Sequence, residues 1–357
     1  MGILDLGNNG DPPRRVVVVK LSALGDVLNT LPVVRTLQRV LPQTRITWVI
    51  GRAAALLLGS IPDIEFLVLD KKEGRRGRSQ IQDTLNAEHI DVVLHMQYAW
   101  RASLLVSGIR SKRKIGYDWQ RAQDLQWLFT NERIESHPNQ HVIDAHFEFI
   151  KKLGISDRDW RFDIPVDRLA DQKAKELIPD DVPTIIISPC SSHPLRNWNA
   201  KGYATVADEM SRQGYRILLC GGQSPLERSM GAEIVRHMTA PVVNHIGQDT
   251  LPEMLATLKR AKMIVTPDSG PAHMGNAVGV PVLGLYAATN PKRSGPYQYI
   301  DYCVDRFPAA ARKFRGKETD QLPWRCKIEQ PGVMDLIRVD DVLERFDAIR
   351  SILDSKQ

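Results

Sequence analysis

Three short segments of the chain carry glycine, hydroxyl, basic or acidic residues in patterns that suit phosphate or sugar chemistry. The first is Lys20-Leu21-Ser22-Ala23-Leu24-Gly25-Asp26. Gly25 permits a tight turn, and Asp26 opens the helix expected to follow, where Asp is a favoured N-cap. The competing role for Asp26 is general base, which needs a carboxylate within reach of an attacking hydroxyl. The segment lacks the Gly-x-Gly-x-x-Gly dinucleotide fingerprint, and this weakens a dehydrogenase interpretation.

The second segment, Ser188 to Trp198, carries adjacent hydroxyls followed by an arginine. Ser191 and Ser192 can donate hydrogen bonds to phosphate oxygens, and the planar guanidinium of Arg196 can bind two oxygens at once. The segment predicts a diphosphate contact, with an ordinary polar loop as the alternative.

The third segment centres on Asp268-Ser269-Gly270-Pro271. Because proline suits the first position of a helix, we expect a strand to end at Asp268-Ser269-Gly270 and a helix to begin near Pro271. The N–H groups and the dipole at such a helix start form an anion site, and His273 in the first turn could donate to a phosphate oxygen. This segment predicts a phosphate pocket.

Two further polar positions follow predicted strands in the same half of the chain. Glu227 could hold vicinal hydroxyls of a ribose or sugar, although a solvent-facing residue at a helix start is an equally good interpretation. Thr289, Asn290 and Arg293 could line the same site, with plain loop structure as the alternative.

Alternating strands and helices are expected to position these segments. The expected strands are short aliphatic or β-branched runs at Arg15–Lys20, Arg45–Ile50, Glu65–Leu69, Asp91–His95, Thr184–Ser188, Arg216–Cys220, Pro241–Ile246, Met263–Thr266 and Val282–Tyr286. Helical spacing is found at Val27–Val40, Lys201–Gln213 and Leu251–Arg260. The alternation implies βαβ units and therefore an α/β fold of two Rossmann-like parallel-sheet domains facing a central cleft. Ligands bind beyond the carboxyl ends of such strands.

At 357 residues the chain exceeds what one compact core usually holds. We expect an N-terminal acceptor-binding domain over residues 1–170 and a C-terminal donor-binding domain over 171–334. Residues 335–357 are expected to form a terminal helix that could lie across either half, including back on the N-terminal domain.

The net charge of +6 is concentrated in three basic clusters that suit an anionic partner or form a solvated face. They consist of Lys71, Lys72, Arg75, Arg76 and Arg78; of Arg110, Lys112, Arg113 and Lys114; and of Arg312, Lys313, Arg315 and Lys317.

The four cysteines form no Cys-x-x-Cys pair, which favours a reducing cytoplasm over a disulfide framework or a zinc site. The sequence shows neither a signal peptide pattern nor an apolar stretch of membrane-spanning length.

Taken together, the segments resemble glycosyltransferase family 9, which includes the lipopolysaccharide heptosyltransferases. The resemblance rests on KLSALGDVLNTLP, SPCSSHPLRNW, TPDSGPAHMGNA and LYAATNPKRSGPY, spread from Lys20 to Tyr297. It implies the GT-B architecture, a donor bound mainly by the C-terminal domain and inversion at the anomeric carbon.

Carried over by position, the resemblance makes Asp26 the general base and Ser191 and Ser192 the diphosphate-binding hydroxyls. Arg196 takes a place where heptosyltransferases often have lysine, so the charge is kept and its geometry changes. Glu227 becomes the sugar-contacting acid. The residues implied to contact the heptose and phosphates are Asp268, Ser269, Gly270 and His273. With so much positive charge at the leaving group, we expect neither a metal nor a cofactor.

The implied partners are ADP-heptose as co-substrate and Kdo-lipid A, or inner-core lipopolysaccharide, as acceptor. Lys71, Lys72, Arg75, Arg76 and Arg78 would contact lipid phosphates and Kdo carboxylates, together with the Arg110–Lys114 cluster. The protein would act in the cytoplasm at the anionic inner face of the membrane.

Two rival interpretations stay open. One is another GT-B sugar-nucleotide enzyme, such as a transferase with a different donor or an epimerase. The other is a non-catalytic nucleotide- or nucleic-acid-binding module, which the basic clusters favour. Aromatic residues make up only 6% of the chain and are not interleaved with the basic runs, so we do not expect nucleic acid as a partner.

Overall fold

Two compact units make up the chain in the computed structural model, which describes residues 12–354. The first unit ends at Pro165 and the second begins at Val166. The division expected after residue 170 would fall inside helix α7 (Arg168–Leu177). Because α7 packs against α10 (Leu251–Arg260), the whole helix belongs to the second unit.

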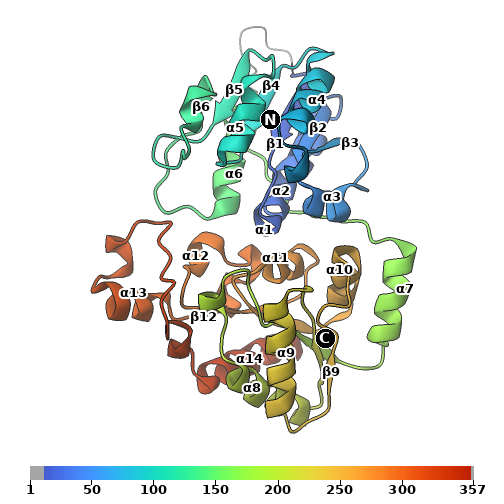
Figure 1. Cartoon of the computed structure of the whole chain (residues 1–357), viewed down its shortest axis with the longest axis vertical. Coiled ribbons are helices and arrows are strands. Elements are labelled where there is room, and N and C mark those ends of the chain that lie inside the picture. Colours follow the sequence, from blue (N-terminus) through green and yellow to red (C-terminus); the bar gives the residue numbers. More distant parts are fainter. Residues whose placement is uncertain (1–11, 355–357) are drawn as a thin grey trace. The chain divides into compact units, whose positions relative to one another are not determined.

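The first unit is a parallel sheet with helices on its two faces (Figure 1). Its strands are β1 (Arg15–Val19), β2 (Arg45–Ile50), β3 (Ile64–Val68), β4 (Val92–His95), β5 (Arg113–Gly116) and β6 (Glu132–Arg133). Its helices are α1 (Leu24–Leu28), α2 (Leu31–Val40), α3 (Arg52–Leu58), α4 (Gly74–Asn86), α5 (Trp100–Ser107) and α6 (Val142–Lys151), with 3₁₀ turns η1 (Lys71–Glu73) and η2 (Gln126–Leu128). The strand order is β3-β2-β1-β4-β5-β6, which is the Rossmann order.

The second unit repeats this plan. Its strands are β7 (Thr184–Ile187), β8 (Arg216–Leu219), β9 (Val242–Asn244), β10 (Met263–Pro267), β11 (Val282–Tyr286) and β12 (Val304–Asp305), in the order β12-β11-β10-β7-β8-β9. Beside α7 and α10, its helices are α8 (Ala200–Arg212), α9 (Pro225–His237), α11 (Gly270–Ala277), α12 (Pro291–Ser294), α13 (Phe307–Arg315) and α14 (Val339–Asp354). Its 3₁₀ turns are η3 (Pro194–Arg196), η4 (Tyr297–Tyr302), η5 (Thr319–Gln321) and η6 (Met334–Leu336). Counted from its first strand, this is the same Rossmann order.

Each sheet therefore has one point where the strand order reverses, which is called its switch point below. In the first sheet β1 lies between β2 and β4, and in the second sheet β7 lies between β8 and β10. The connections that leave the carboxyl ends of the two central strands diverge there, and ligands of such folds bind at this place. Three candidate segments follow strands at these points: Asp26 comes after β1, Ser191 after β7 and Asp268 after β10. Glu227 comes after β8, one strand away from the reversal.

Two expectations about elements were incomplete or wrong. Strands β5, β6 and β12 were not predicted, because they are two to four residues long and lack an aliphatic run. The single helix expected over Val27–Val40 is two helices, α1 and α2. Pro32 causes the break, since its ring and missing N–H are tolerated only in a first helical turn, where α2 places it.

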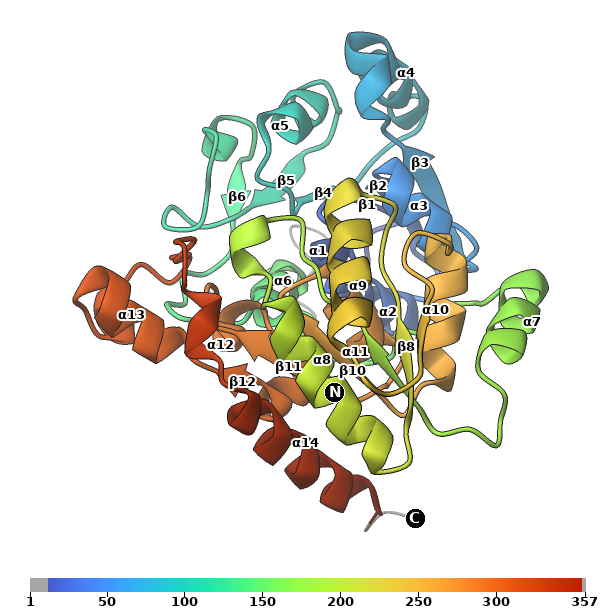
Figure 2. The same cartoon turned by 60° about the horizontal axis from the view of Figure 1, so that its bottom comes forward.

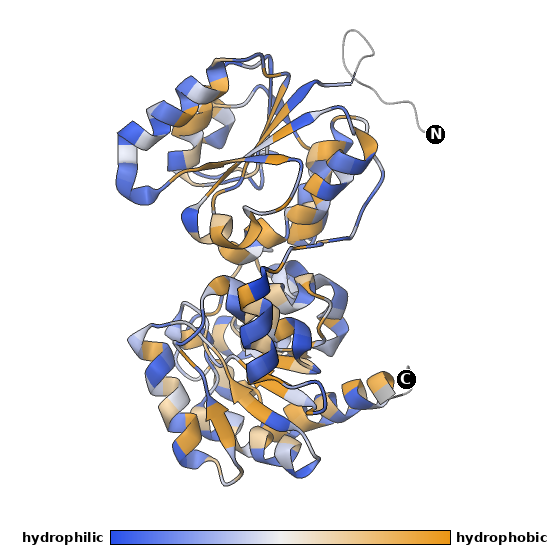
Figure 3. Ribbon diagram, turned by 90° about the vertical axis from the view of Figure 1, so that its right-hand side faces the viewer, coloured by the Kyte–Doolittle hydropathy of each residue, from blue (hydrophilic) through white to orange (hydrophobic). Residues whose placement is uncertain are grey.

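The terminal helix α14 packs into the core of the second unit. Phe346 and Ile349 are buried there together with residues of α8, β7 and β11. Figure 2 shows α14 running past α8 and β12, the elements it packs against. In Figure 3 most of the longer strands are hydrophobic, and polar residues lie on the outer sides of the helices. Within residues 12–354, no helix combines the length and the hydropathy that crossing a bilayer requires.

The position of α14 predicts the outcome of truncating its side chains. Phe346→Ala removes a ring that is only 1% exposed and should lower the free energy of unfolding of the second unit by about 3–5 kcal/mol. Ile352→Ala on the same helix, where the side chain is 39% exposed, should change it by less than about 1 kcal/mol. Urea denaturation followed by tryptophan fluorescence measures both. Equal effects of the two substitutions would show that α14 is not part of this core.

Candidate functional site

Asp26 lies in the first turn of α1, but it is not the helix cap. Ala23 occupies the N-cap position, so the N-cap interpretation of Asp26 is wrong. The Asp26 carboxylate, 41% exposed, has its Oδ2 atom 3.6 Å from Nζ of Lys20, whose side chain is only 1% exposed. The switch point of the first unit thus carries a solvent-accessible carboxylate, that of Asp26, which forms an ion pair with the buried ammonium group of Lys20.

The surroundings of Lys20 contain two buried histidines that stay neutral. Burial, and after it the charge of Lys20, lowers the pKa of both His95 and His146 to about 3. His146 Nδ1 lies 3.2 Å from both the Thr30 hydroxyl and the Asn29 carbonyl oxygen, directly after α1. Since neither imidazole carries a charge near neutral pH, Asp26 is the carboxylate that balances the Lys20 ammonium.

Gln97 fixes the loop that carries these groups. Its Oε1 accepts hydrogen bonds from the backbone N–H groups of Leu21 (3.1 Å) and Ser22 (3.2 Å). Gln97 follows β4, so the two strands at the switch point are joined through their loops. Gln126 in turn donates to the Gln97 carbonyl oxygen at 3.0 Å. Lys20 and Gln97 are not among the residues predicted for the site, because the contacts that they make depend on which strands are neighbours in the sheet.

In the second unit, the loop after β7 is held in a fixed conformation. Ser191 is buried; its hydroxyl donates to the His193 carbonyl oxygen at 3.0 Å, and its N–H donates to Asn197 Oδ1 at 2.7 Å. Ser192 is exposed beside it. The two adjacent hydroxyls therefore differ, since Ser191 shapes the loop while Ser192 faces solvent.

Arg196 forms the centre of the charge network at the second switch point. Its Nε donates to Glu329 Oε1 at 2.7 Å, and its Nη1 lies 4.0 Å from Asp268 Oδ2. His193 Nε2 lies 3.7 Å from the other Glu329 oxygen. The structure thus brings the loops after β7 and β10 together through one guanidinium. Glu329, which is 133 residues from Arg196, was not anticipated.

Further cations surround this network. Partial burial and the charge of Arg196 lower the pKa of Lys327, with the Arg293 charge acting in the same direction. Glu329 and Asp268 oppose these effects on Lys327. The Ile328 N–H donates to the Ala288 carbonyl oxygen at 2.8 Å, which ties this segment to the loop after β11. Three cations and two carboxylates leave the network with an excess positive charge, which suits an anionic ligand.

Helix α11 begins at this same place. Ser269 is its N-cap residue, yet the Ser269 hydroxyl pairs with the Thr266 hydroxyl at 2.8 Å and makes no capping hydrogen bond. Gly270 opens the helix, and His273 is buried within its first turn. A Cβ atom on Gly275 would lie 2.9 Å from Ile264 and 3.0 Å from Val282, so glycine allows α11 to pack closely on β10 and β11. The start of α11 is thereby fixed at the switch point, as an anion site requires.

Glu227 has a structural role in this conformation. Its Oε1 accepts from the Gly222 N–H at 2.7 Å, and its Oε2 accepts from the Ser224 hydroxyl at 2.6 Å. Both interactions organise the start of α9, and Asn290 similarly caps α12 through the Lys292 N–H. The site of Glu227 after β8 agrees with the expectation, whereas no observation assigns it a sugar contact.

The basic clusters differ in how many of their side chains form ion pairs or hydrogen bonds within the fold and how many are exposed to solvent. Lys71, Lys72, Arg75 and Arg76 are exposed on η1 and the start of α4, and Arg78 is partly exposed. In the second cluster, however, Arg113 is bound by Glu132 (2.7 Å), and Lys114 donates to the Val106 carbonyl oxygen (3.0 Å). The first cluster therefore offers its side chains to solvent, as does the third, in which Arg312, Lys313, Arg315 and Lys317 are all exposed.

An Asp-x-Asp triplet, Asp157-Arg158-Asp159, occurs in the first unit but is taken up by ion pairs. Arg39 lies 3.3 Å from Asp157 and 3.7 Å from Asp159, and Arg161 lies 2.6 Å from Asp159. The hydrogen bond from Arg161 lowers the pKa of Asp159. This arrangement indicates a structural cluster.

Comparison with known proteins identifies the family. The model of glycosyltransferase family 9 (heptosyltransferase) matches residues 78–324. The lipopolysaccharide core heptosyltransferase OpsX of Haemophilus influenzae is 35% identical over 93% of this chain and 96% of its own length. A family 9 glycosyltransferase structure from Veillonella parvula superimposes with a TM-score of 0.77 at 26% identity, covering 94% of this chain and 96% of the other.

The E. coli heptosyltransferase WaaC, solved with ADP, has a TM-score of 0.65 at 23% identity and shows the same fold, covering 79% of this chain and 90% of its own. The predicted fold class, two Rossmann-like α/β domains as in GT-B enzymes, is confirmed. With the family model matching most of the chain and one relative matching nearly all of it, this protein belongs to glycosyltransferase family 9, the heptosyltransferases.

Proposed function

We propose that the protein is an inverting lipopolysaccharide heptosyltransferase that transfers heptose from ADP-L-glycero-β-D-manno-heptose to Kdo-lipid A or the inner core. The observation that carries this proposal is the pair of switch points: a carboxylate with a buried counter-ion in the first unit, and a positively charged network with a helix start in the second. The likeness to WaaC, which was solved with ADP and with ADP-2-deoxy-2-fluoro heptose, supports the choice of donor.

In the proposed mechanism Asp26 accepts the proton of the acceptor hydroxyl while that oxygen forms a bond to the anomeric carbon. The bond from this carbon to the diphosphate oxygen breaks, and its electron pair leaves with ADP. The transition state then resembles an oxocarbenium ion, as in other glycosyl transfers. Charge developing on ADP is stabilised by Arg196, Ser192 and the start of α11 at Gly270 to His273. Asp268, Ser269 and Glu227 are proposed to contact the donor, with Ser191 holding the loop.

No metal or cofactor takes part in this proposal, because the cations around Arg196 can meet the charge of the diphosphate. The exposed cluster of Lys71, Lys72, Arg75, Arg76 and Arg78 is proposed to contact acceptor phosphates and the anionic inner face of the cytoplasmic membrane. No contact with nucleic acid is part of this function.

The direct test is a transfer assay with ADP-heptose and Kdo-lipid A, run beside other nucleotide sugars and beside reactions without acceptor. The proposal expects product only when both ADP-heptose and the lipid are present. Turnover of the nucleotide sugar without acceptor would instead support an epimerase, and preference for a different donor would support another GT-B transferase.

Replacing the proposed base should abolish transfer while leaving the donor site intact. We expect Asp26→Asn to lower kcat by at least about 100-fold, because the amide cannot accept the proton. Protection of the protein by ADP against thermal unfolding should remain as in the wild type. Asp83→Asn, at an exposed position of α4, is the matched control and should keep full activity. Near-normal turnover of a folded Asp26→Asn protein would refute the role of Asp26.

Lys20 is expected to act as a positioning residue through Asp26. Lys20→Met keeps the volume of the buried side chain but removes the ammonium 3.6 Å from the carboxylate, so kcat should fall by about 10-fold or more. In an Asp26→Asn background the same change should have little further effect, since residues that act as a unit are not additive. A multiplicative loss in the double variant would show that Lys20 supports activity by another route.

Arg196 is expected to contribute to ADP binding. Loss of a charge-assisted contact of about 1.5–3 kcal/mol should weaken ADP roughly 10- to 100-fold. Arg196→Ala should therefore reduce the ADP-dependent rise in melting temperature. Arg212→Ala, in the same unit but exposed on α8, should leave that rise unchanged. An unaltered ADP effect in Arg196→Ala would exclude the diphosphate contact.

A further inference from the structure

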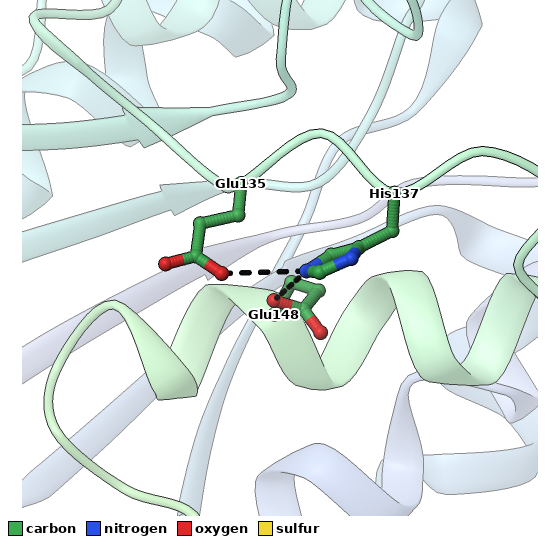
Figure 4. Close-up of side chains that lie close together, drawn as sticks. All are labelled: Glu135, His137 and Glu148. Carbon is green, nitrogen blue, oxygen red and sulfur yellow. Dashed lines mark hydrogen bonds and ion pairs between the residues drawn. The ribbon is translucent and has the colours of Figure 1, made fainter.

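Three potential metal ligands converge in the first unit, outside the region that follows β1. Glu135 and His137 lie in the connection between β6 and α6, and Glu148 lies on α6 (Figure 4). Their ligand atoms all lie within 4.8 Å of one another. The proposed transfer reaction uses none of these side chains.

The distances within this group match those of a coordinated metal. His137 Nε2 lies 3.3 Å from Glu135 Oε2 and 3.4 Å from Glu148 Oε2. With metal–ligand bonds of about 2.0–2.2 Å, tetrahedral coordination places neighbouring ligand atoms roughly 3.3–3.6 Å apart. The ring nitrogen therefore stands at tetrahedral spacing from both carboxylate oxygens.

Glu148 supplies a second, independent observation. Its side chain is only 6% exposed, and its buried Oε2 makes no hydrogen bond, with His137 Nε2 at 3.4 Å and Lys151 Nζ at 3.5 Å as its neighbours. Gln140 donates instead to the other oxygen, Oε1, at 3.3 Å. A buried carboxylate oxygen that has ion-pair neighbours but no hydrogen bond is incompletely satisfied, and a metal ion would bind it directly.

The position of the Lys151 ammonium group shows that a positive charge is favourable between Glu135 and Glu148. Its Nζ lies 3.0 Å from Glu135 Oε2 and 3.5 Å from Glu148 Oε2, the same two oxygens that face His137. The hydrogen bond from Lys151 lowers the pKa of Glu135. The Lys151 side chain is half exposed at the end of α6, so it can turn out to solvent. It is a built-in competitor for a metal ion at this position.

Hydrogen bonds hold the backbone around Glu135, His137 and Glu148 in place without a bound metal. Arg121 donates to the Glu135 carbonyl oxygen at 2.5 Å and to Gln140 Oε1 at 2.8 Å, which spans the segment bearing Glu135 and His137. Gln140 then orients Glu148. Outer contacts of this kind fix the orientation of ligands in metal sites. A pocket lined by Glu135, Glu148 and Lys151 opens the group to solvent.

We propose that Glu135, His137 and Glu148 bind one divalent transition-metal ion, with Zn²⁺ as the best match. The bound ion would link the segment after β6 to helix α6. Imidazole together with carboxylates suits Zn²⁺, whereas Mg²⁺ and Ca²⁺ prefer sets of six or more oxygen ligands. Water would complete the coordination. The metal takes no part in glycosyl transfer.

The test is zinc retention by the full-length protein after chelation, reloading with Zn²⁺ and removal of free metal. We expect one Zn²⁺ per wild-type chain and none for His137→Ala or for Glu135→Gln, which changes an exposed side chain and should fold normally. Lys151→Met removes the competing cation and should bind Zn²⁺ at least 10-fold more tightly. In parallel, Mg²⁺ should be retained by none of these proteins.

The matched control is His89→Ala, which removes an exposed histidine 3.3 Å from a single carboxylate, Asp91, and should retain zinc like the wild type. Loading with Co²⁺ gives a second measurement, since tetrahedral coordination produces visible absorption that His137→Ala should lack. Absence of zinc from the wild type, equal zinc in His137→Ala, or weaker binding by Lys151→Met would each overturn the proposal.

Discussion

The reversal of strand order beside β1 and beside β7 is the constraint on which the rest of this structure depends. In each unit the chain builds two strands on one side of the first strand and then crosses to build three on the other side. The loops after the two central strands consequently turn away from each other, and the polar segments can occupy the region between them without burying unpaired backbone groups. The protein uses this arrangement twice with different chemistry.

In the first unit the switch point holds a charge that would be unfavourable by itself. Lys20 is almost completely buried, and an isolated ammonium there would be costly, because burial disfavours the charged form. The Asp26 carboxylate compensates for it, and the neutral state of His95 and His146 prevents further positive charge from accumulating. The side of Asp26 that faces away from Lys20 stays accessible to solvent. Burial of the lysine and exposure of the acid are thus two parts of one arrangement.

In the second unit the switch point is organised by Arg196. Its interactions with Glu329 and Asp268 orient the guanidinium between the loop after β7 and the start of α11. The added charges of Lys327 and Arg293 keep the local balance positive even though two carboxylates are present. Such a network is oriented before any ligand arrives, which reduces the reorganisation that charge development on a leaving group requires.

The sequence predicts the fold class, most strands and the segments that follow them, because buried parallel strands are aliphatic runs and helix starts have distinctive residues such as Pro271. It did not show the short polar strands β5, β6 and β12, whose existence depends on a neighbouring strand that is already in place. It also overlooked Pro32, which divides the first long helix into α1 and α2. The packing of α14 on the second unit was decided by the tertiary structure, since an amphipathic helix does not specify which core receives its apolar face.

The residues proposed to act in the reaction divide in a similar way between those that the sequence predicts and those that only the fold reveals. Asp26, Arg196 and Asp268 could be selected from local patterns, since each follows a strand. The partners that set their charge and orientation, Lys20 and Glu329, depend on distances across the fold and have no local signature. The same holds for the approach of Glu135 and His137 to Glu148. A linear pattern records which side chains are present, whereas electrostatic interactions between them fall off with spatial distance, which only the folded chain defines.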